Sequence, residues 1–263
     1  MSSLAQEPVL PVLDGRVALV TGAGRGLGAA TAEMLARAGA KLVLMSRTAS
    51  ELEEVAARIS AAGGTATTRV CDVCDSQAMR AAIAKIPRLD ILVNNAGTNI
   101  PAEFVDVREE DLDRMISLTV RAGFLVAQAA VRKMLETPAE ERMPGGSAVV
   151  HVTSQMGRVG SQRRTVYCMV KHALEGLNKA MAVELAPQGI RSNSVAPTFL
   201  KTAMTEPFFA RDPAFLDWVL NRIPLRRLGT VDEVARTILF LASPAASLIT
   251  GESLATDGGW TAQ

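Results

Sequence analysis

Short apolar segments alternate along this chain with longer segments of helical periodicity, and this alternation limits the fold more than any other feature. Apolar strands that are joined through helices form parallel sheets covered on both faces, and right-handed crossovers make such a sheet doubly wound. The sequence therefore predicts an α/β fold with a parallel sheet of about seven strands flanked by helices. The expected strands are 16–21, 41–46, 65–70, 89–95, 147–154, 189–197 and 252–256, and the expected helices are 25–39, 49–64, 75–86, 109–135, 167–186 and 231–242.

The bulk composition fits one folded domain and excludes some partners. The chain has 263 residues, 48% of them apolar and 21% charged, which permits a sizeable core. Lys and Arg total 28 against 27 Asp and Glu, so no net charge attracts nucleic acid or an anionic membrane surface. No apolar run reaches the ~18 residues of a membrane-spanning helix. We therefore expect no nucleic-acid partner and no membrane insertion.

The first residues and the cysteines bear on the compartment. Residues 1–12 contain two prolines and lack a basic region followed by an apolar core, so we expect a loose lead-in rather than a secretory signal. The domain itself is expected to span residues 13–263. Three cysteines do not suggest a disulfide scaffold, and a cytoplasmic location is the default. Cys71 and Cys74 form a single CxxC without histidines at metal-ligand spacing, so no metal site is predicted.

A glycine-rich turn, TGAGRGLG at 21–28, joins the first expected strand to the first expected helix. Glycines at such a place permit a tight turn and let a pyrophosphate reach backbone N–H groups at the helix N-terminus. The alternative is an ordinary turn with small residues for packing. The position between strand and helix favours dinucleotide binding, and so a Rossmann-type domain.

The single tyrosine, Tyr167, stands four residues before Lys171. A phenol and an ammonium at positions i and i+4 share one face of a helix. The cation is expected to favour the phenolate and to lower the tyrosine pKa from its usual value of about 10, which makes the phenol a usable acid or base. Taken alone, the pair also fits a half-buried tyrosine beside a surface lysine.

Several motifs in their order and spacing resemble the short-chain dehydrogenase/reductase family, compact branch, over nearly the whole chain. They are TGxxxGxG from Thr21 to Gly28, NNAG at 94–97, Ser154, Tyr167 with Lys171, Pro197, Thr202 and the ending ITGESLATDGGW at 249–260. The resemblance implies that Tyr167 passes a proton to or from the substrate oxygen. It also implies that Lys171 lowers the tyrosine pKa and holds the nicotinamide ribose, and that Ser154 hydrogen-bonds the substrate carbonyl or hydroxyl. A serine at a strand end also often bonds backbone groups.

Two positions depart from the family pattern. Thr119 stands where the family usually has an asparagine that takes part in a proton relay through water, and a hydroxyl has a shorter reach than a carboxamide. Thr198 follows Pro197 where a glycine is common, and its side chain is expected to narrow the nicotinamide side of the pocket.

The cofactor preference is read from the end of the second expected strand. An acidic residue there would bind the ribose 2′-hydroxyl and select NAD. Ser46 occupies that position, and Arg47 and Arg25 carry guanidinium groups that suit a 2′-phosphate, although both could also be solvated surface residues. We expect NADP rather than NAD. The residues expected to hold it are Gly22, Arg25, Gly26, Leu27, Ser46, Arg47, Asp72, Val73, Asn95, Tyr167, Lys171 and Thr202.

Aromatic residues gather in the segment that the family uses as a substrate lid, about 199–222: Phe199, Phe208, Phe209, Phe215 and Trp218. An aromatic lid would exclude water and favour an apolar or ring-bearing substrate. Packing against a neighbouring subunit is the alternative. Residues 122–131 are apolar on more sides than one buried stripe needs, which agrees with the homotetramer or homodimer that the resemblance implies.

These features together predict an NADP-dependent oxidoreductase that interconverts a carbonyl and an alcohol on a small molecule by hydride transfer. The alternative is a catalytically silent dinucleotide-binding sensor or scaffold, which the Thr119 departure favours and the intact Ser154, Tyr167 and Lys171 oppose.

Overall fold

A parallel sheet forms the centre of the computed structural model, which describes residues 12–142, 144–202 and 205–263. Within these residues the sheet has seven strands in the order β3-β2-β1-β4-β5-β6-β9. The chain runs outward from β1 to β3 and then returns to β4 on the other side of β1, so the crevice between β1 and β4 is the switch point. The predicted fold class is confirmed. The strands are β1 (Val17–Thr21), β2 (Lys41–Ser46), β3 (Thr65–Val70), β4 (Ile91–Asn94), β5 (Ser147–Val152), β6 (Ile190–Pro197) and β9 (Ser253–Thr256).

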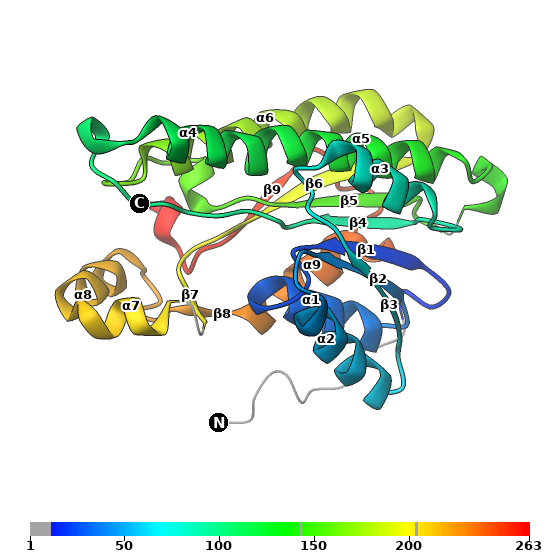
Figure 1. The fold of residues 1–263 in the computed structure, drawn as a ribbon, viewed down its shortest axis with the longest axis horizontal. Helices are drawn as coiled ribbons and strands as arrows, with labels where there is room; N and C mark the ends of the chain where they lie inside the picture. The colour runs from blue at the N-terminus through cyan, green and yellow to red at the C-terminus, as the bar shows by residue number, and fades with distance from the viewer. Residues whose placement is uncertain (1–11, 143, 203–204) are drawn as a thin grey trace.

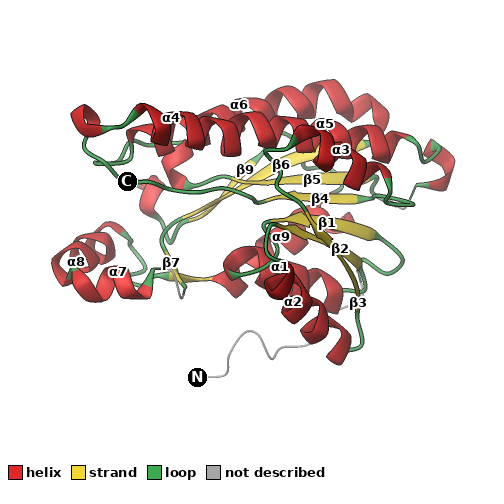
Figure 2. Ribbon diagram, in the orientation of Figure 1, coloured by secondary structure: helices red, strands yellow, loops and turns green. Residues whose placement is uncertain are grey.

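Helices cover both faces of this sheet (Figure 1, Figure 2). One face carries α1 (Gly26–Arg37), α2 (Ala49–Ala61) and α9 (Val231–Ala242), and the other carries α3 (Ser76–Ala84), α4 (Glu109–Met115), α5 (Ala122–Leu135) and α6 (Thr165–Leu185).

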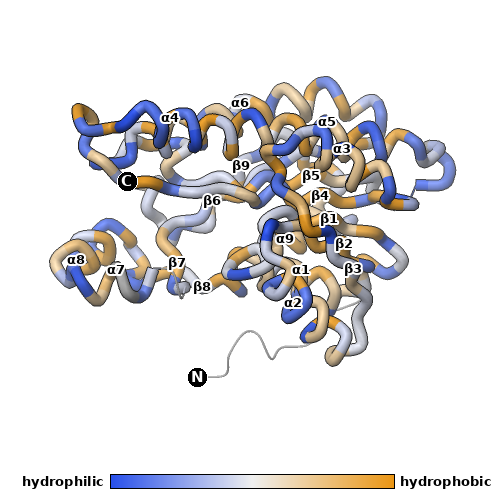
Figure 3. Tube along the Cα trace, viewed as in Figure 1, coloured by the Kyte–Doolittle hydropathy of each residue, from blue (hydrophilic) through white to orange (hydrophobic). Residues whose placement is uncertain are grey.

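The strands alternate their side chains between the two faces. Ala18 and Val20 of β1 pack in the core under α1 and α9, whereas Leu19 packs in the core under α3 and α5. The central strands β1 and β4 are therefore largely apolar, as a sheet buried on both faces requires, and the tube of Figure 3 is orange along them. The edge strand β3 is more polar and only partly buried.

The long helix expected at 109–135 is present but irregular, because a π-helical turn, η3 (Ile116–Arg121), separates α4 from α5. By length and a mean hydropathy of 1.2 this helix could span a membrane, but Ala122, Val126 and Ala130 are buried in the core. It is a core helix of the fold. π-Helical turns often occur at functional sites, and this one carries Thr119.

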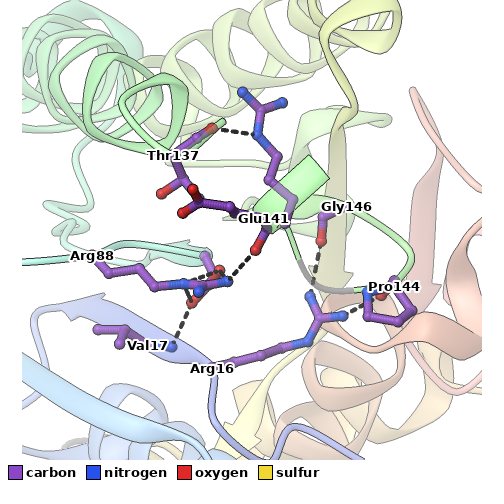
Figure 4. Close-up of polar contacts among 9 residues, drawn as sticks. Arg16, Val17, Arg88, Thr137, Glu141, Pro144 and Gly146 are labelled. Carbon is purple, nitrogen blue, oxygen red and sulfur yellow. Dashed lines mark hydrogen bonds and ion pairs between the residues drawn. The ribbon is translucent and has the colours of Figure 1, made fainter. Parts of the chain in front are cut away.

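Polar contacts close the end of the sheet at which the parallel strands have their amino termini (Figure 4). The buried Arg16 donates to the carbonyl oxygens of Pro144 and Gly146, the latter at 2.8 Å. Asp90 accepts from the Val17 N–H at 2.9 Å and from the Arg88 guanidinium. These contacts hold the loop after α5 against the start of β1. The carboxyl ends of the strands, at the opposite end of the sheet, are left for the site.

The segment after β6 contains elements that the sequence analysis did not expect. A second sheet in the described part pairs β7 (Leu200–Lys201) with β8 (Gly229–Thr230), and α7 (Glu206–Arg211) and α8 (Pro213–Arg222) lie between them, beyond the end of the main sheet (Figure 1).

The rings of this segment pack on one another. The ring centroids of Phe199 and Phe215 are 5.8 Å apart, those of Phe209 and Phe215 6.1 Å, and those of Trp218 and Trp260 5.8 Å. The side chain of Phe208 lies outside the described residues. The described rings form a small core of their own with Trp260, and the lid stays a prediction.

Candidate active site

A cleft of about 860 Å³ lies at the carboxyl ends of the neighbouring strands β1 and β4. Its volume is in the range of pockets that hold organic cofactors, which runs to about 1,000 Å³. Most residues predicted to hold the cofactor line this single cleft, although they come from distant parts of the chain. They are Gly22, Arg25, Gly26, Leu27, Ser46, Arg47, Asp72, Val73, Asn95 and Thr202.

The glycine-rich turn fits the pyrophosphate of a dinucleotide. Gly22 has a φ of +65°, and a Cβ at Gly28 would lie 2.1 Å from the Gly22 carbonyl oxygen, so a larger residue at position 28 would displace the turn. The Asn95 side chain donates to the Thr21 carbonyl at 2.9 Å and holds the turn against β4. Arg25 at the start of α1 makes no side-chain capping bond, which leaves the first N–H groups of α1 free to bind an anion.

Ser154, Tyr167 and Lys171 meet at the inner side of this region. Ser154 follows β5, and Tyr167 and Lys171 lie on the first turns of α6. The Ser154 hydroxyl lies close enough to the Tyr167 phenol to lower its pKa, and the Lys171 Nζ lies 5.5 Å from the centroid of the tyrosine ring. The predicted pairing of phenol and ammonium on one helix face is therefore present. Ser154 also accepts from the Met156 N–H at 3.1 Å, so the backbone-bonding alternative holds as well.

The expected direction of the tyrosine pKa is wrong for this structure. Burial raises the pKa of Tyr167, and the hydrogen bond with Ser154 and the charge of Arg164 oppose that rise. The Lys171 ammonium donates to the Val152 carbonyl oxygen at 2.8 Å. Burial also lowers the pKa of Lys171 to about 8, against the charge of Glu175.

A buried carboxylate, which the sequence analysis missed, stands one helical turn beyond Lys171. Glu175 accepts from the hydroxyl of Thr153 at 2.5 Å, of Ser194 at 2.7 Å and of Ser253 at 2.9 Å. These hydroxyls lie on or next to β5, β6 and β9, so the network ties α6 to the sheet directly behind the site. A glutamate at i+4 to the lysine was the available signal.

Thr119 and Lys171 both approach Gly97 at the site. A Cβ on Gly97 would lie 3.9 Å from both the Thr119 Oγ1 and the Lys171 Nζ. The Thr119 side chain is buried, and its hydroxyl has no hydrogen-bond partner among the described residues. The hydroxyl therefore has bonding capacity to spare near Gly97.

The arginines near the site differ in their surroundings. Arg25 and Arg47 at the cleft are largely exposed and face Glu51 at 3.5 Å and Asp72 at 4.0 Å. Arg164, one turn before Tyr167, is buried, and its Nε lacks a hydrogen-bond partner in the described part of the chain.

A fully buried histidine, His151, lies at the end of β5. The Asn94 amide nitrogen is 3.3 Å from the His151 Nδ1, and the same nitrogen donates its other proton to the Gly123 carbonyl oxygen. Because an amide nitrogen is a donor, the His151 Nδ1 accepts, and the buried ring is a neutral imidazole. Burial, reinforced by the charge of Lys171, lowers the pKa of His151 to about 4.

The free energy of unfolding should therefore fall as the pH is lowered through the range in which only the unfolded chain protonates His151. Between pH 6.5 and about 4 the unfolded chain binds a proton at this residue that the folded protein does not. Stability is then lost as the pH falls, by about 3 kcal/mol at this residue. Urea unfolding measures the free energy of unfolding of wild type and of His151→Gln across this window. The free energy of wild type minus that of His151→Gln should shrink by about that amount as the pH falls from 6.5 to about 4. The exposed His172→Gln is the control, and equal pH slopes in wild type and His151→Gln would contradict the prediction.

The fold and site together define a dinucleotide-binding oxidoreductase of the Rossmann type. A family model described as enoyl-(acyl carrier protein) reductase, one of the short-chain dehydrogenases, matches residues 22–261. L-xylulose reductase of Bos taurus is 39% identical over 250 residues, covering 95% of this chain and 98% of that protein. D-erythrulose reductase of Gallus gallus is 38% identical over 247 residues, covering 94% and 96%.

A solved structure agrees with these relatives. The crystal structure of a gluconate 5-dehydrogenase from Burkholderia cenocepacia J2315, in complex with NADP and tartrate, superposes with a TM-score of 0.88 at 34% identity, covering 95% of this chain and 97% of that one. The chain belongs to the short-chain dehydrogenase/reductase family. By class it is an NAD(P)-dependent short-chain alcohol dehydrogenase or carbonyl reductase.

Proposed function

We propose that this protein is an NADP-dependent reductase of polyhydroxylated ketones, with Tyr167 as the proton donor. The observation that carries the proposal is the convergence of the Ser154 hydroxyl, the Tyr167 phenol and the Lys171 ammonium beside a cleft of dinucleotide size. When bound, the nicotinamide supplies the hydride. The protein must then stabilise and protonate the oxygen on which negative charge develops.

The chain's own residues divide that work. Ser154 donates a hydrogen bond to the substrate oxygen, and Tyr167 passes its phenolic proton to it. Because burial raises the pKa of Tyr167, the phenol is protonated at neutral pH and is ready to donate to a ketone oxygen. Lys171 holds a positive charge near the phenolate that forms, and Glu175 opposes the loss of that charge through burial.

Two observations support NADP as the cofactor. Arg25 and Arg47 stand at the cleft next to Ser46, where an acidic residue would select NAD. The structure of the gluconate 5-dehydrogenase, which is 34% identical to this chain, contains NADP. Val73 and Asp72 are then the neighbours of the adenine, and Asn95 of the ribose.

The substrate class rests on polar groups beside Ser154. The buried side chains of Gln155 and Thr198 have Nε2 and Oγ1 atoms without a partner in the described chain. Buried polar groups need hydrogen bonds, and hydroxyl groups of a substrate would supply them. The names of the relatives, L-xylulose and D-erythrulose reductase, point to the same chemistry. An apolar substrate is not proposed, because the described rings of 199–222 pack on one another.

We also infer a cytoplasmic homo-oligomer, a tetramer or a dimer. Phe124 on α5 and Met169 and Val183 on α6 are exposed apolar side chains on one layer of the molecule, and a second copy would cover them. Cys71, Cys74 and Cys168 are free, which suits a reducing compartment.

Initial-rate assays with NADPH and NADH should separate the proposal from its alternative. L-xylulose, D-erythrulose and 5-ketogluconate should be reduced with NADPH, at about tenfold or higher kcat/KM than with NADH, because one charge-assisted phosphate contact supplies at least that factor. Cyclohexanone serves as the apolar control ketone. Tight NADPH binding without turnover of any ketone would identify a silent sensor, and a clear NADH preference would refute the argument from the arginines.

A further inference from the structure

The rim of the cleft next to Ser46 carries a carboxylate that the NADP assignment does not use. Glu51 lies in the first turn of α2, three residues after the N-cap residue Thr48. That spacing is typical of a capping box, but the Thr48 side chain makes no capping hydrogen bond. The side chain of Glu51 instead reaches across to the glycine-rich turn.

The neighbours of this carboxylate show where it lies. A Cβ built on Gly24 would lie 2.8 Å from the Glu51 Oε2 and 3.2 Å from the Ser46 hydroxyl. The carboxylate thus stands at the end of β2, against the turn after β1. In dinucleotide-binding folds this is where an acidic side chain binds the ribose 2′-hydroxyl. Glu51 supplies from α2 the carboxylate that Ser46 lacks.

The same carboxylate forms an ion pair with Arg25, one of the arginines expected to bind a 2′-phosphate. The Arg25 Nη1 is 3.5 Å from the Glu51 Oε1, and Arg47 faces Asp72 at 4.0 Å. Each of these guanidinium groups is therefore matched by a carboxylate. A 2′-phosphate must draw Arg25 away from Glu51 and also accept the repulsion of the carboxylate.

We infer that Glu51 sets the preference between NADPH and NADH, so that this enzyme uses both cofactors and selects NADPH less strongly than its arginines alone would allow. The inference rests on the proposed function. With NADH bound, the Glu51 carboxylate accepts from the ribose 2′-hydroxyl. With NADPH bound, Glu51 turns away and Arg25 binds the phosphate.

Glu51→Gln tests this through the dissociation constants of NADPH and NADH, measured by titration without substrate. The Kd of NADPH should fall about tenfold, because Arg25 no longer has to leave a carboxylate in order to bind the dianionic phosphate. The Kd of NADH should rise severalfold, because an amide is a weaker acceptor for the 2′-hydroxyl. Glu53→Gln is the matched control, with the same charge change on an exposed neighbour of the same helix, and should leave the ratio of the two constants as in wild type.

The outcomes separate the inference from the proposed function. A Glu51→Gln ratio equal to that of Glu53→Gln, or a weaker binding of NADPH, overturns the role of Glu51 while NADP-dependence stands. Failure of wild type to bind either dinucleotide overturns both. The gain in NADPH affinity should also shrink at high salt, because the groups are exposed to solvent. A gain that is independent of salt contradicts the electrostatic cause.

Discussion

Replacing Tyr167 by phenylalanine should lower kcat by about a thousandfold, within the range of a positioned general acid, while the Kd of NADPH changes little. The change removes one hydroxyl from a half-buried ring that is otherwise held by α6 and by the Lys171 ammonium at 5.5 Å. The reacting oxygen then keeps the hydrogen bond from Ser154 but loses the phenol that protonates it, whereas the cleft around Gly22, Arg25 and Asn95 is untouched. Initial rates and a fluorescence titration with NADPH measure the two quantities separately.

The control for this variant lies two residues further on. Met169→Leu changes an exposed side chain on the same turn of α6 and should keep wild-type rates. A Tyr167→Phe enzyme with a rate near that of wild type would remove the phenol from its assigned role. A large loss of NADPH affinity in the same variant would instead mean that the hydroxyl serves mainly to bind the cofactor.

Replacing Lys171 by methionine should lower kcat by about a hundredfold or more, because a preorganised charge near the developing oxyanion contributes at least that factor. The same variant should be more stable than wild type at pH 7 by about 2 kcal/mol. Burial lowers the pKa of Lys171 from 10.5 to about 8, which corresponds to about 3 kcal/mol of cost for the charged form. The lost hydrogen bond to the Val152 carbonyl offsets about 1 kcal/mol.

The sign of this effect shows in the pH dependence of stability. Between pH 8 and 10.5 the unfolded chain holds a proton on Lys171 that the folded protein has lost. Wild-type stability should therefore rise with pH through this window, and the advantage of Lys171→Met should disappear. Lys179→Met, an exposed lysine two turns further along α6, is the control. Urea unfolding of wild type and both variants at pH 8 and pH 10.5 measures this change in stability. A Lys171→Met variant that is less stable than wild type at pH 7 would contradict the prediction and show that the ammonium stabilises the fold.

The sheet could be predicted from sequence because its central strands are largely apolar and alternate with segments of helical periodicity. The expected ranges 41–46 and 65–70 are the observed β2 and β3, and 231–242 is the observed α9. The position of the cofactor residues followed from the fold, since the carboxyl ends of β1, β2 and β4 must meet at the switch point. Short-range patterns of this kind do not depend on distant contacts.

The features that sequence could not give depend on such contacts. The burial that raises the Tyr167 pKa comes from the packing of distant elements around the ring, and the Val152 carbonyl that binds the Lys171 ammonium also lies on another element. The Glu175 network needs hydroxyls near three strands that are far apart in the chain. The ring partner Trp260 lies near the C-terminus, outside the predicted aromatic segment. The π-helical turn at Thr119 has no local sequence signal of its own.

Transfer of a labelled hydride tests the central claim most directly. Wild-type enzyme is given NADPH deuterated at the reactive nicotinamide carbon, together with L-xylulose in ordinary water, and the alcohol product is analysed by mass spectrometry. The account predicts one deuterium on the former carbonyl carbon of the product, and none there when unlabelled NADPH is used in deuterated water. An alcohol that takes this hydrogen from the solvent, or unchanged ketone beside bound NADPH, would contradict it.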